Sequence, residues 1–143
     1  MGPVERAVNL FENGRNCSQA VLTVFGEKFG IDSETAARLG RPWGGGMGHL
    51  ALTCGALTGA IMVLGLSKAH GDEGEARREA FEAVRELFRR FEEKHGSTVC
   101  RELLGADMST EEGKKKIREE KIVSKVCPGY VRSAAEILAE LIS

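Results

Sequence analysis

The stretch of sequence that organises this chain reads Thr53-Cys54-Gly55-Ala56-Leu57-Thr58-Gly59-Ala60. It combines one cysteine with two glycines four positions apart, and it heads the most apolar run of the chain, residues 50–66. A membrane-spanning helix needs about 20 predominantly apolar residues, and the threonines and glycines dilute this run. We therefore predict a buried helix over about 51–69 that forms the centre of the fold.

The rest of the chain also repeats its hydrophobic residues at helical spacing, and no strand alternation or hairpin signal stands out. Start and stop signals predict further helices over residues 3–13, 17–28, 33–40 and 75–94, between 97 and 105, from 109 onward and from 128 onward. The fold class is therefore expected to be all-α. We predict one domain over residues 1–143, a bundle of six to eight helices around the central glycine-containing helix.

Polar residues and proline define the expected helix ends. The predicted N-caps are Asn16, Asp32 or Ser33, Ser97 and Ser109. Pro128 suits the first turn of the final helix, because its missing N–H is not needed there. His70 and His95 are interpreted as C-terminal caps, where a cation is favoured.

Two further stretches carry structural predictions. Residues 44–48 contain four glycines, which are costly inside a helix, so 41–49 is predicted to be an irregular loop. The long helix predicted over 75–94 carries a wide apolar stripe composed of Ala80, Phe81, Val84, Leu87, Phe88 and Phe91. A buried core explains this stripe, and its phenylalanines would equally suit a homodimer interface.

Composition excludes several classes of function. The 143 residues are 42% hydrophobic and 29% charged, as in ordinary globular domains, and the formal net charge is -1. This balance provides no field that would attract nucleic acid or an anionic membrane surface. No signal-peptide pattern opens the sequence. We therefore expect a cytoplasmic protein without membrane insertion, in a compartment that keeps thiols reduced.

Four cysteines, Cys17, Cys54, Cys100 and Cys127, are the strongest functional signal. No Cys-x-x-Cys pair is present, which argues against a thioredoxin-type motif or a zinc ribbon, so the fold must assemble any shared site. Each cysteine is predicted at or near a helix start, where free N–H groups and the helix dipole stabilise a thiolate. We predict that the four thiols form one catalytic site with Cys54 at its centre. The alternative is that they only pack, as free cysteines often do.

Residues near Cys54 are the predicted cofactor-binding positions. Gly55 and Gly59 lie one helical turn apart and would let either a neighbouring helix or a bulky cofactor approach closely. Trp43 would either wall the thiol site or fill the core. His49 would either activate a thiolate and ligate a metal, or stand as an ordinary loop histidine.

The cysteine pattern resembles that of the C_GCAxxG_C_C family of small proteins. The likeness rests on Cys17, on Cys54 with the Gly-Ala-Leu-Thr-Gly that follows it, and on Cys100 and Cys127. The contexts at 16–21 and 44–48 are also similar. Redox activity is inferred for this family from its cysteines, and its genes tend to lie near transporter genes. The resemblance therefore implies a redox-active protein, without a substrate or an established cofactor.

Three chemistries suit four thiols at one site. An iron–sulfur cluster would use all four as metal ligands, whereas dithiol–disulfide exchange needs one reactive thiol and a resolving partner. A four-cysteine zinc site is less favoured, because zinc ligands usually come in close-spaced pairs. We expect a thiol-based oxidoreductase or electron-transfer protein that works with a redox partner. The competing hypothesis is a non-enzymatic protein that binds a metal or cluster and is associated with a transporter.

Overall fold

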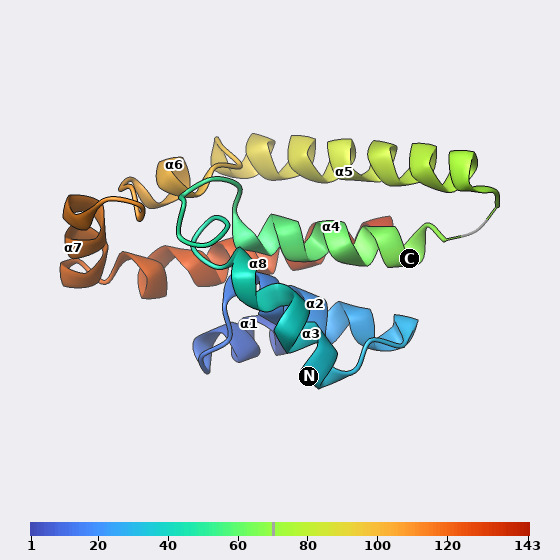
Figure 1. Cartoon of the computed structure of the whole chain (residues 1–143), viewed down its shortest axis with the longest axis horizontal. Coiled ribbons are helices and arrows are strands. Elements are labelled where there is room, and N and C mark those ends of the chain that lie inside the picture. The colour runs from blue at the N-terminus through green and yellow to red at the C-terminus, as the bar shows by residue number, and fades with distance from the viewer. Residues whose placement is uncertain (70) are drawn as a thin grey trace.

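The computed structural model describes residues 1–69 and 71–143, and it confirms the all-α prediction (Figure 1). The helices in these residues are α1 (Pro3–Glu12), α2 (Cys17–Gly26), α3 (Ser33–Gly40), α4 (Gly55–Ser67), α5 (Glu73–His95), α6 (Cys100–Leu104), α7 (Glu111–Glu119) and α8 (Ile122–Leu141). Two 3-10 turns, η1 (Glu27–Phe29) and η2 (Arg41–Trp43), follow α2 and α3. Figure 1 shows α5 running beside and above α4, with α8 passing behind α4 and with α1, α2 and α3 grouped beneath it.

The hydrophobic core lies where α2, α4, α5 and α8 meet. Its fully buried large side chains include Leu57, Leu64, Leu87, Phe91 and Leu138. Burying each such side chain stabilises the fold by about 1.5–3 kcal/mol. Within the described ranges, no helix is long and apolar enough to cross a membrane.

The glycines of α4 let α2 approach its backbone closely. A Cβ atom at Gly59 would lie 2.7 Å from the carbonyl oxygen of Ser18 and 3.2 Å from the Cβ atom of Val21. A Cβ atom at Gly55 would lie 3.1 Å from the Cβ atom of Cys17. The group that approaches this glycine face is therefore a helix of the same chain.

The helix α4 begins later than predicted, at Gly55 instead of residue 51, and Cys54 is its N-cap residue. The loop before it is left-handed, with φ between 60° and 70° at Gly45, Gly46, Met47, Gly48, His49 and Ala51. Such backbone is costly for residues with a Cβ atom and easy for glycine. The glycine cluster therefore indicated an irregular loop correctly, but the loop extends further into the apolar run than the periodicity suggested.

The helix α8 begins earlier than predicted, at Ile122, so that Pro128 lies inside it. Lys121, with φ 53°, separates α7 from α8. Val123 and Val126 pack against a small core cluster, so burial favours helix on the N-terminal side of the proline. Pro128 has no N–H to offer the carbonyl one turn earlier, which normally disfavours this position.

Two of the four predicted N-caps are wrong. Asn16 caps α2 in a full capping box, and Asp32 caps α3, as predicted. Val99 and Thr110 hold the N-cap positions that were assigned to Ser97 and Ser109. Both serine side chains instead form hydrogen bonds within the turns that precede α6 and α7. The observed N-caps of α6 and α7 therefore lie two residues and one residue after the predicted ones.

His95 ends α5, but its ring turns inward instead of capping the helix. Its Nε2 atom lies 2.8 Å from Ser133 Oγ, and its ring stands edge-on to Tyr130 with the centroids 5.0 Å apart. Gly96 is the C-cap residue. The corresponding prediction for His70 falls outside the described residues.

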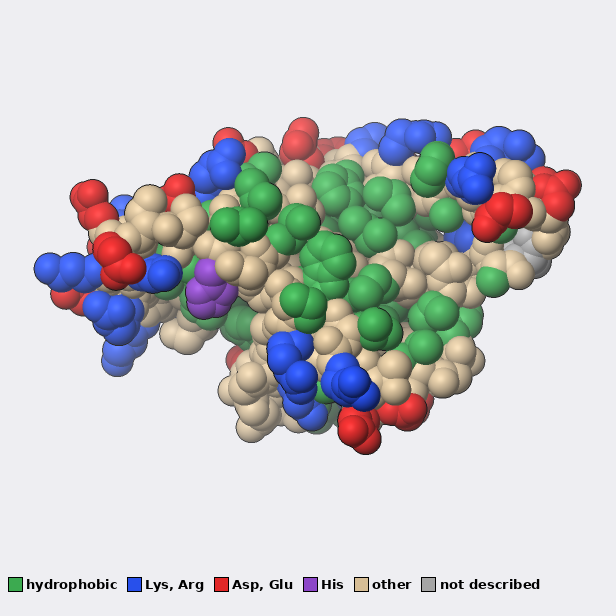
Figure 2. Space-filling view, in the orientation of Figure 1, with side chains coloured by type: hydrophobic (Ala, Val, Ile, Leu, Met, Phe, Trp, Pro, Cys, Tyr) green, Lys and Arg blue, Asp and Glu red, His purple; other side chains and the backbone are tan. Residues whose placement is uncertain are grey.

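The apolar stripe of α5 is only partly buried. Leu87 and Phe91 are fully buried, whereas Phe81 is 55% exposed, so the stripe is narrower than predicted. Leu39, Leu50 and Leu52 are also exposed, and Figure 2 shows hydrophobic side chains gathered across the middle of one face. The homodimer interpretation of the phenylalanines stays a prediction.

Candidate functional site

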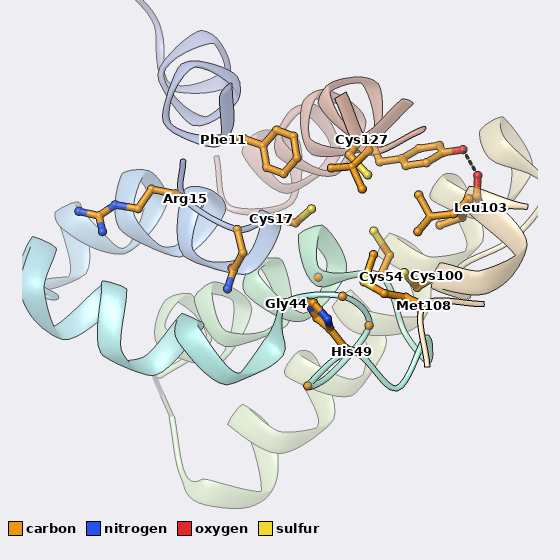
Figure 3. A pocket seen from close by; sticks show the side chains of 18 of the residues that line it. Phe11, Arg15, Cys17, Gly44, His49, Cys54, Cys100, Leu103, Met108 and Cys127 are labelled. Carbon is orange, nitrogen blue, oxygen red and sulfur yellow. Dashed lines mark hydrogen bonds between the residues drawn. The ribbon is translucent and has the colours of Figure 1, made fainter. Parts of the chain in front are cut away.

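Four free cysteines from distant parts of the chain line one cavity of about 570 Å³ (Figure 3). Its other walls are Phe11, Gly14, Arg15, Asn16, Arg41, Pro42, Gly44, Gly45, Gly46, Gly48, His49, Gly55, Leu103, Leu104, Met108, Val123 and Tyr130. The fold thus brings together the four thiols that the sequence analysis placed in one site.

Cys17 is positioned by the capped start of α2. The Asn16 side chain accepts the N–H of Gln19 at 2.8 Å, and the Gln19 side chain accepts the N–H of Asn16 at 3.0 Å. The Asn16 amide also donates to the carbonyls of Gly40 and Arg41, at 3.3 and 3.1 Å. These bonds join the first turn of α2 to the end of α3 and fix Cys17, a half-buried residue, at the cavity.

Cys54 and Cys100 are brought together by backbone pairing. Thr53 and Val99 form an isolated antiparallel bridge. The N–H groups of Cys54 and Cys100 each donate to a carbonyl across this bridge, at 3.0 and 2.5 Å. Residues on either side of a bridged pair point to the same face, and diagonal neighbours lie about 7–8 Å apart. The bridge therefore holds the N-cap of α4 beside the first residue of α6.

Cys127 reaches the cavity from the interior of α8, which corrects the prediction that it precedes a helix start. Its thiol interacts with the thiol of Cys17, and this interaction shifts the pKa of both groups. The helix-start pattern therefore holds for Cys17, Cys54 and Cys100 but not for Cys127.

The four thiols differ in how readily they ionise. Burial raises the pKa of Cys54 to about 12 and that of Cys100 to about 11. The S–H of Cys17 donates to Cys127, and this hydrogen bond lowers the pKa of Cys127 despite its burial. The same hydrogen bond, together with burial, raises the pKa of Cys17 well above its ordinary value. Cys127 is therefore the thiol that loses its proton first, and Cys54 stays protonated near neutral pH.

The glycine loop forms the wall of the cavity next to Cys100. A Cβ atom at Gly46 would lie 2.6 Å from the backbone nitrogen of Leu52 and 2.7 Å from the Cβ atom of Cys100. A Cβ atom at Gly45 would collide with the ring of His49. Both positions also have positive φ, so glycine is needed here for conformation and for space.

The other predicted site residues are placed unequally. His49 is exposed and lines the cavity, and Gly55 also lines it. Trp43 is half-buried, and its neighbours Pro42 and Gly44 line the cavity while Trp43 itself does not. Gly59 lies further along α4, against Ser18.

Residues 1–69 and 71–143 contain no group of three His, Cys, Asp or Glu side chains placed to hold one metal ion. Cys17 and Cys127 form an interacting pair, and Cys54 and Cys100 are buried close enough to interact with Cys127 electrostatically. A tetrahedral zinc site needs ligands that converge on one ion. The described residues therefore do not fit a single zinc ion.

Tyr130 is a site residue that the sequence analysis missed. Its ring lines the cavity, and its hydroxyl donates to the carbonyl of Leu103 at 2.7 Å, which ties α8 to α6. Tyr130 is the only tyrosine of the chain and stands three positions after Cys127. Once the segment is recognised as helix, that spacing places both residues on one face.

Comparison with known proteins agrees with the cysteine pattern. A family model described as "Putative redox-active protein (C_GCAxxG_C_C)" matches residues 15–141. The matched span includes all four cysteines and the whole glycine loop. No curated protein and no solved structure matches the chain.

Proposed function

Because this chain belongs to the C_GCAxxG_C_C family, whose description is of redox activity, we propose that it performs dithiol–disulfide exchange. Cys127 is the attacking thiol and Cys17 is the resolving thiol. The observation that carries this proposal is that Cys17 and Cys127 line one cavity and interact there, and this interaction lowers the pKa of Cys127. The thiolate is the nucleophile in such reactions, and a neighbouring thiol is needed to complete them.

The reaction has two steps. The Cys127 thiolate attacks one sulfur of a disulfide RS–SR, the S–S bond breaks, and RS⁻ leaves. Cys17 then attacks Cys127 in the mixed disulfide, its proton passes to the second leaving sulfur, and RSH departs. The protein has lost two electrons as the Cys17–Cys127 bond formed, and the substrate has gained them as RS⁻ and RSH. A reducing dithiol reverses the same steps.

Cys54 and Cys100 have a supporting part in this proposal. Their raised pKa values keep them as neutral thiols at neutral pH, so they do not compete with Cys127 as nucleophiles. The antiparallel bridge holds them to one another and beside the active pair. This assignment moves the centre of the site from Cys54 to the Cys17–Cys127 pair.

The alternative function, a metal- or cluster-carrying accessory protein, is less well supported. It draws on the presence of four thiols around one cavity. A single bound metal ion would require a rearrangement of the side chains, since no three ligands are placed to hold one ion among the described residues. We therefore keep it as an outcome of the test.

The test begins with anaerobically purified, fully reduced protein. The protein is treated with one equivalent of a small disulfide, and the cross-link is located by peptide mass spectrometry. We expect a Cys17–Cys127 disulfide that dithiothreitol removes, with the other two cysteines free. Iron and acid-labile sulfide are measured on the same sample. Matching amounts of iron and sulfide, or a disulfide that joins Cys54 to Cys100, would overturn the proposal.

Matched variants separate the roles of the thiols. Cys17→Ser should trap the substrate as a mixed disulfide on Cys127, because the resolving sulfur is gone. Cys127→Ser should abolish the reaction. Cys54→Ser and Cys100→Ser should still form the Cys17–Cys127 disulfide. Reaction at the same rate in Cys127→Ser would contradict the assignment of the nucleophile.

A further inference from the structure

Building on the exchange reaction proposed above, we infer that the substrate is a low-molecular-weight disulfide that carries carboxylate groups. This substrate class follows from the size of the cavity, the burial of the thiols and the charges at the cavity wall.

The thiols are too deeply placed for a disulfide fixed in a protein surface. Cys54, Cys100 and Cys127 are only 5%, 9% and 7% exposed. The Cys17 residue is half-buried, and its thiol points toward Cys127 inside the cavity (Figure 3). The cavity volume of about 570 Å³ falls within the range of about 300–1,000 Å³ that holds small ligands. A small flexible disulfide can therefore reach Cys127 where a folded partner cannot.

Among Lys, Arg, Asp and Glu, the side chains that line the cavity in the described chain are both arginines, and Asp107 lies outside the lining but close enough to help raise the pKa of Cys100. Arg15 and Arg41 line the cavity, and no Asp or Glu is among the lining residues of the described chain. Neither guanidinium forms an ion pair or side-chain hydrogen bond with any residue in the described ranges. Figure 3 shows the Arg15 side chain extending away from the sulfurs, so its charge stands at the rim. Arginine binds carboxylates through paired N–H groups, and a one-signed cleft raises the local concentration of the opposite charge.

The glycine loop adds hydrogen-bond donors to the same cavity. Gly45 and Gly46 line it, and the N–H group of neither has an acceptor among residues 1–69 and 71–143. Successive free N–H groups in a turn are suited to an anion. The loop and the two arginines thus offer a carboxylate several donors while its disulfide reaches the thiols.

The experiment compares three small disulfides that differ in charge. Dithiodiglycolate is anionic, bis(2-hydroxyethyl) disulfide is neutral and cystamine is cationic. The rate of formation of the Cys17–Cys127 disulfide is measured for each in the reduced wild type and in Arg15→Gln/Arg41→Gln. Because intrinsic reactivity differs among the disulfides, the ratio of wild-type to variant rate is compared for each reagent.

We expect this ratio to be roughly tenfold for the anionic disulfide at low salt, within about twofold of one for the neutral reagent and below one for the cationic reagent. Added salt should shrink the difference, because both arginines are exposed. Arg78→Gln/Arg118→Gln removes the same charge from exposed positions outside the cavity and should leave all three rates unchanged.

Equal ratios for the three reagents would overturn the carboxylate preference while the exchange reaction itself still stands. Equal effects of the two double variants would also overturn it, since the effect would then be one of net charge. Failure of every disulfide to oxidise the Cys17–Cys127 pair would overturn both the substrate class and the proposed function. Calorimetry could also show that dithiodiglycolate binds without reacting. That result would support the anion site but would overturn the exchange reaction, and with it the proposed substrate class.

Discussion

Replacing Cys17 by alanine should make Cys127 a much poorer nucleophile. The hydrogen bond from Cys17 lowers the pKa of Cys127, and burial acts in the opposite direction. Cys17→Ala removes the donor and leaves the burial. The pKa of Cys127 should then rise toward that of Cys100, a comparably buried thiol of the same cavity whose pKa is about 11.

The expected loss of reactivity follows from this comparison. A thiol with a pKa of about 11 has a thiolate fraction at pH 7 about a hundredfold smaller than one at the ordinary value of 9.0. The more basic thiolate is intrinsically more reactive, with a Brønsted coefficient of about 0.5, and this recovers about tenfold. The net reaction rate of Cys127 at pH 7 should therefore fall by at least about tenfold.

The assay is the pH dependence of alkylation by iodoacetamide, followed at Cys127 by peptide mass spectrometry. Cys17→Ser is the matched control, because its hydroxyl keeps a donor beside Cys127 although it cannot form a disulfide. Cys100→Ala is a second control, because it empties a neighbouring thiol position without touching the pair. Both controls should keep the wild-type profile of Cys127.

An unchanged alkylation profile of Cys127 in Cys17→Ala would refute the reasoning. Preferential alkylation of Cys17 over Cys127 in the wild-type protein would refute it as well, because it would reverse the direction of the hydrogen bond. The two results differ in meaning: the first removes the coupling between the thiols, and the second exchanges their roles.

Further predictions concern stability and are measured by urea denaturation. Gly59→Ala should destabilise the fold by about 1–3 kcal/mol, because the new Cβ atom would lie 2.7 Å from the Ser18 carbonyl oxygen. Gly65→Ala is the matched control in the same helix, because a Cβ atom there would meet nothing within 4 Å. It should be neutral or stabilise the fold by up to about 1 kcal/mol. Pro128→Ala restores an N–H inside α8 and should stabilise by about 1–2 kcal/mol, and a loss of stability would mean that the proline ring packs favourably. Burial lowers the pKa of His95 in the folded state. The contribution of neutral His95 to the free energy of unfolding should therefore be complete near pH 7.5 and should decline as pH falls below about 6.5. His95→Gln should flatten that decline.

Features that depend on neighbouring residues were predictable from the sequence. The cap at Asn16 and the irregular glycine loop each rest on backbone chemistry within a few positions. The grouping of the four thiols around one cavity agrees with the prediction that they share a site, which rested on the position of the cysteines near predicted helix starts.

Features that depend on distant residues were not predictable. The bridge between Thr53 and Val99 joins only one residue pair, so neither segment shows strand alternation. The continuation of α8 through Pro128 is favoured by the packing of Val123 and Val126, which local propensity cannot include. The pairing of Cys17 with Cys127 depends on that continuation, because it sets where Cys127 points.

The long separation of the paired sulfurs along the chain has a thermodynamic consequence. Cys17 and Cys127 lie roughly 110 positions apart, and a cross-link closing a loop of that order stabilises a folded chain by about 4.7 kcal/mol in the loop-entropy description. By the thermodynamic cycle, folding stabilises the Cys17–Cys127 disulfide relative to the two free thiols by the same free energy. At about 1.4 kcal/mol per 30 mV, this lowers the reduction potential of the folded pair by about 100 mV relative to the unfolded chain. Reductants would then act on this protein as mild denaturants, and unfolding would release its stored oxidising equivalent.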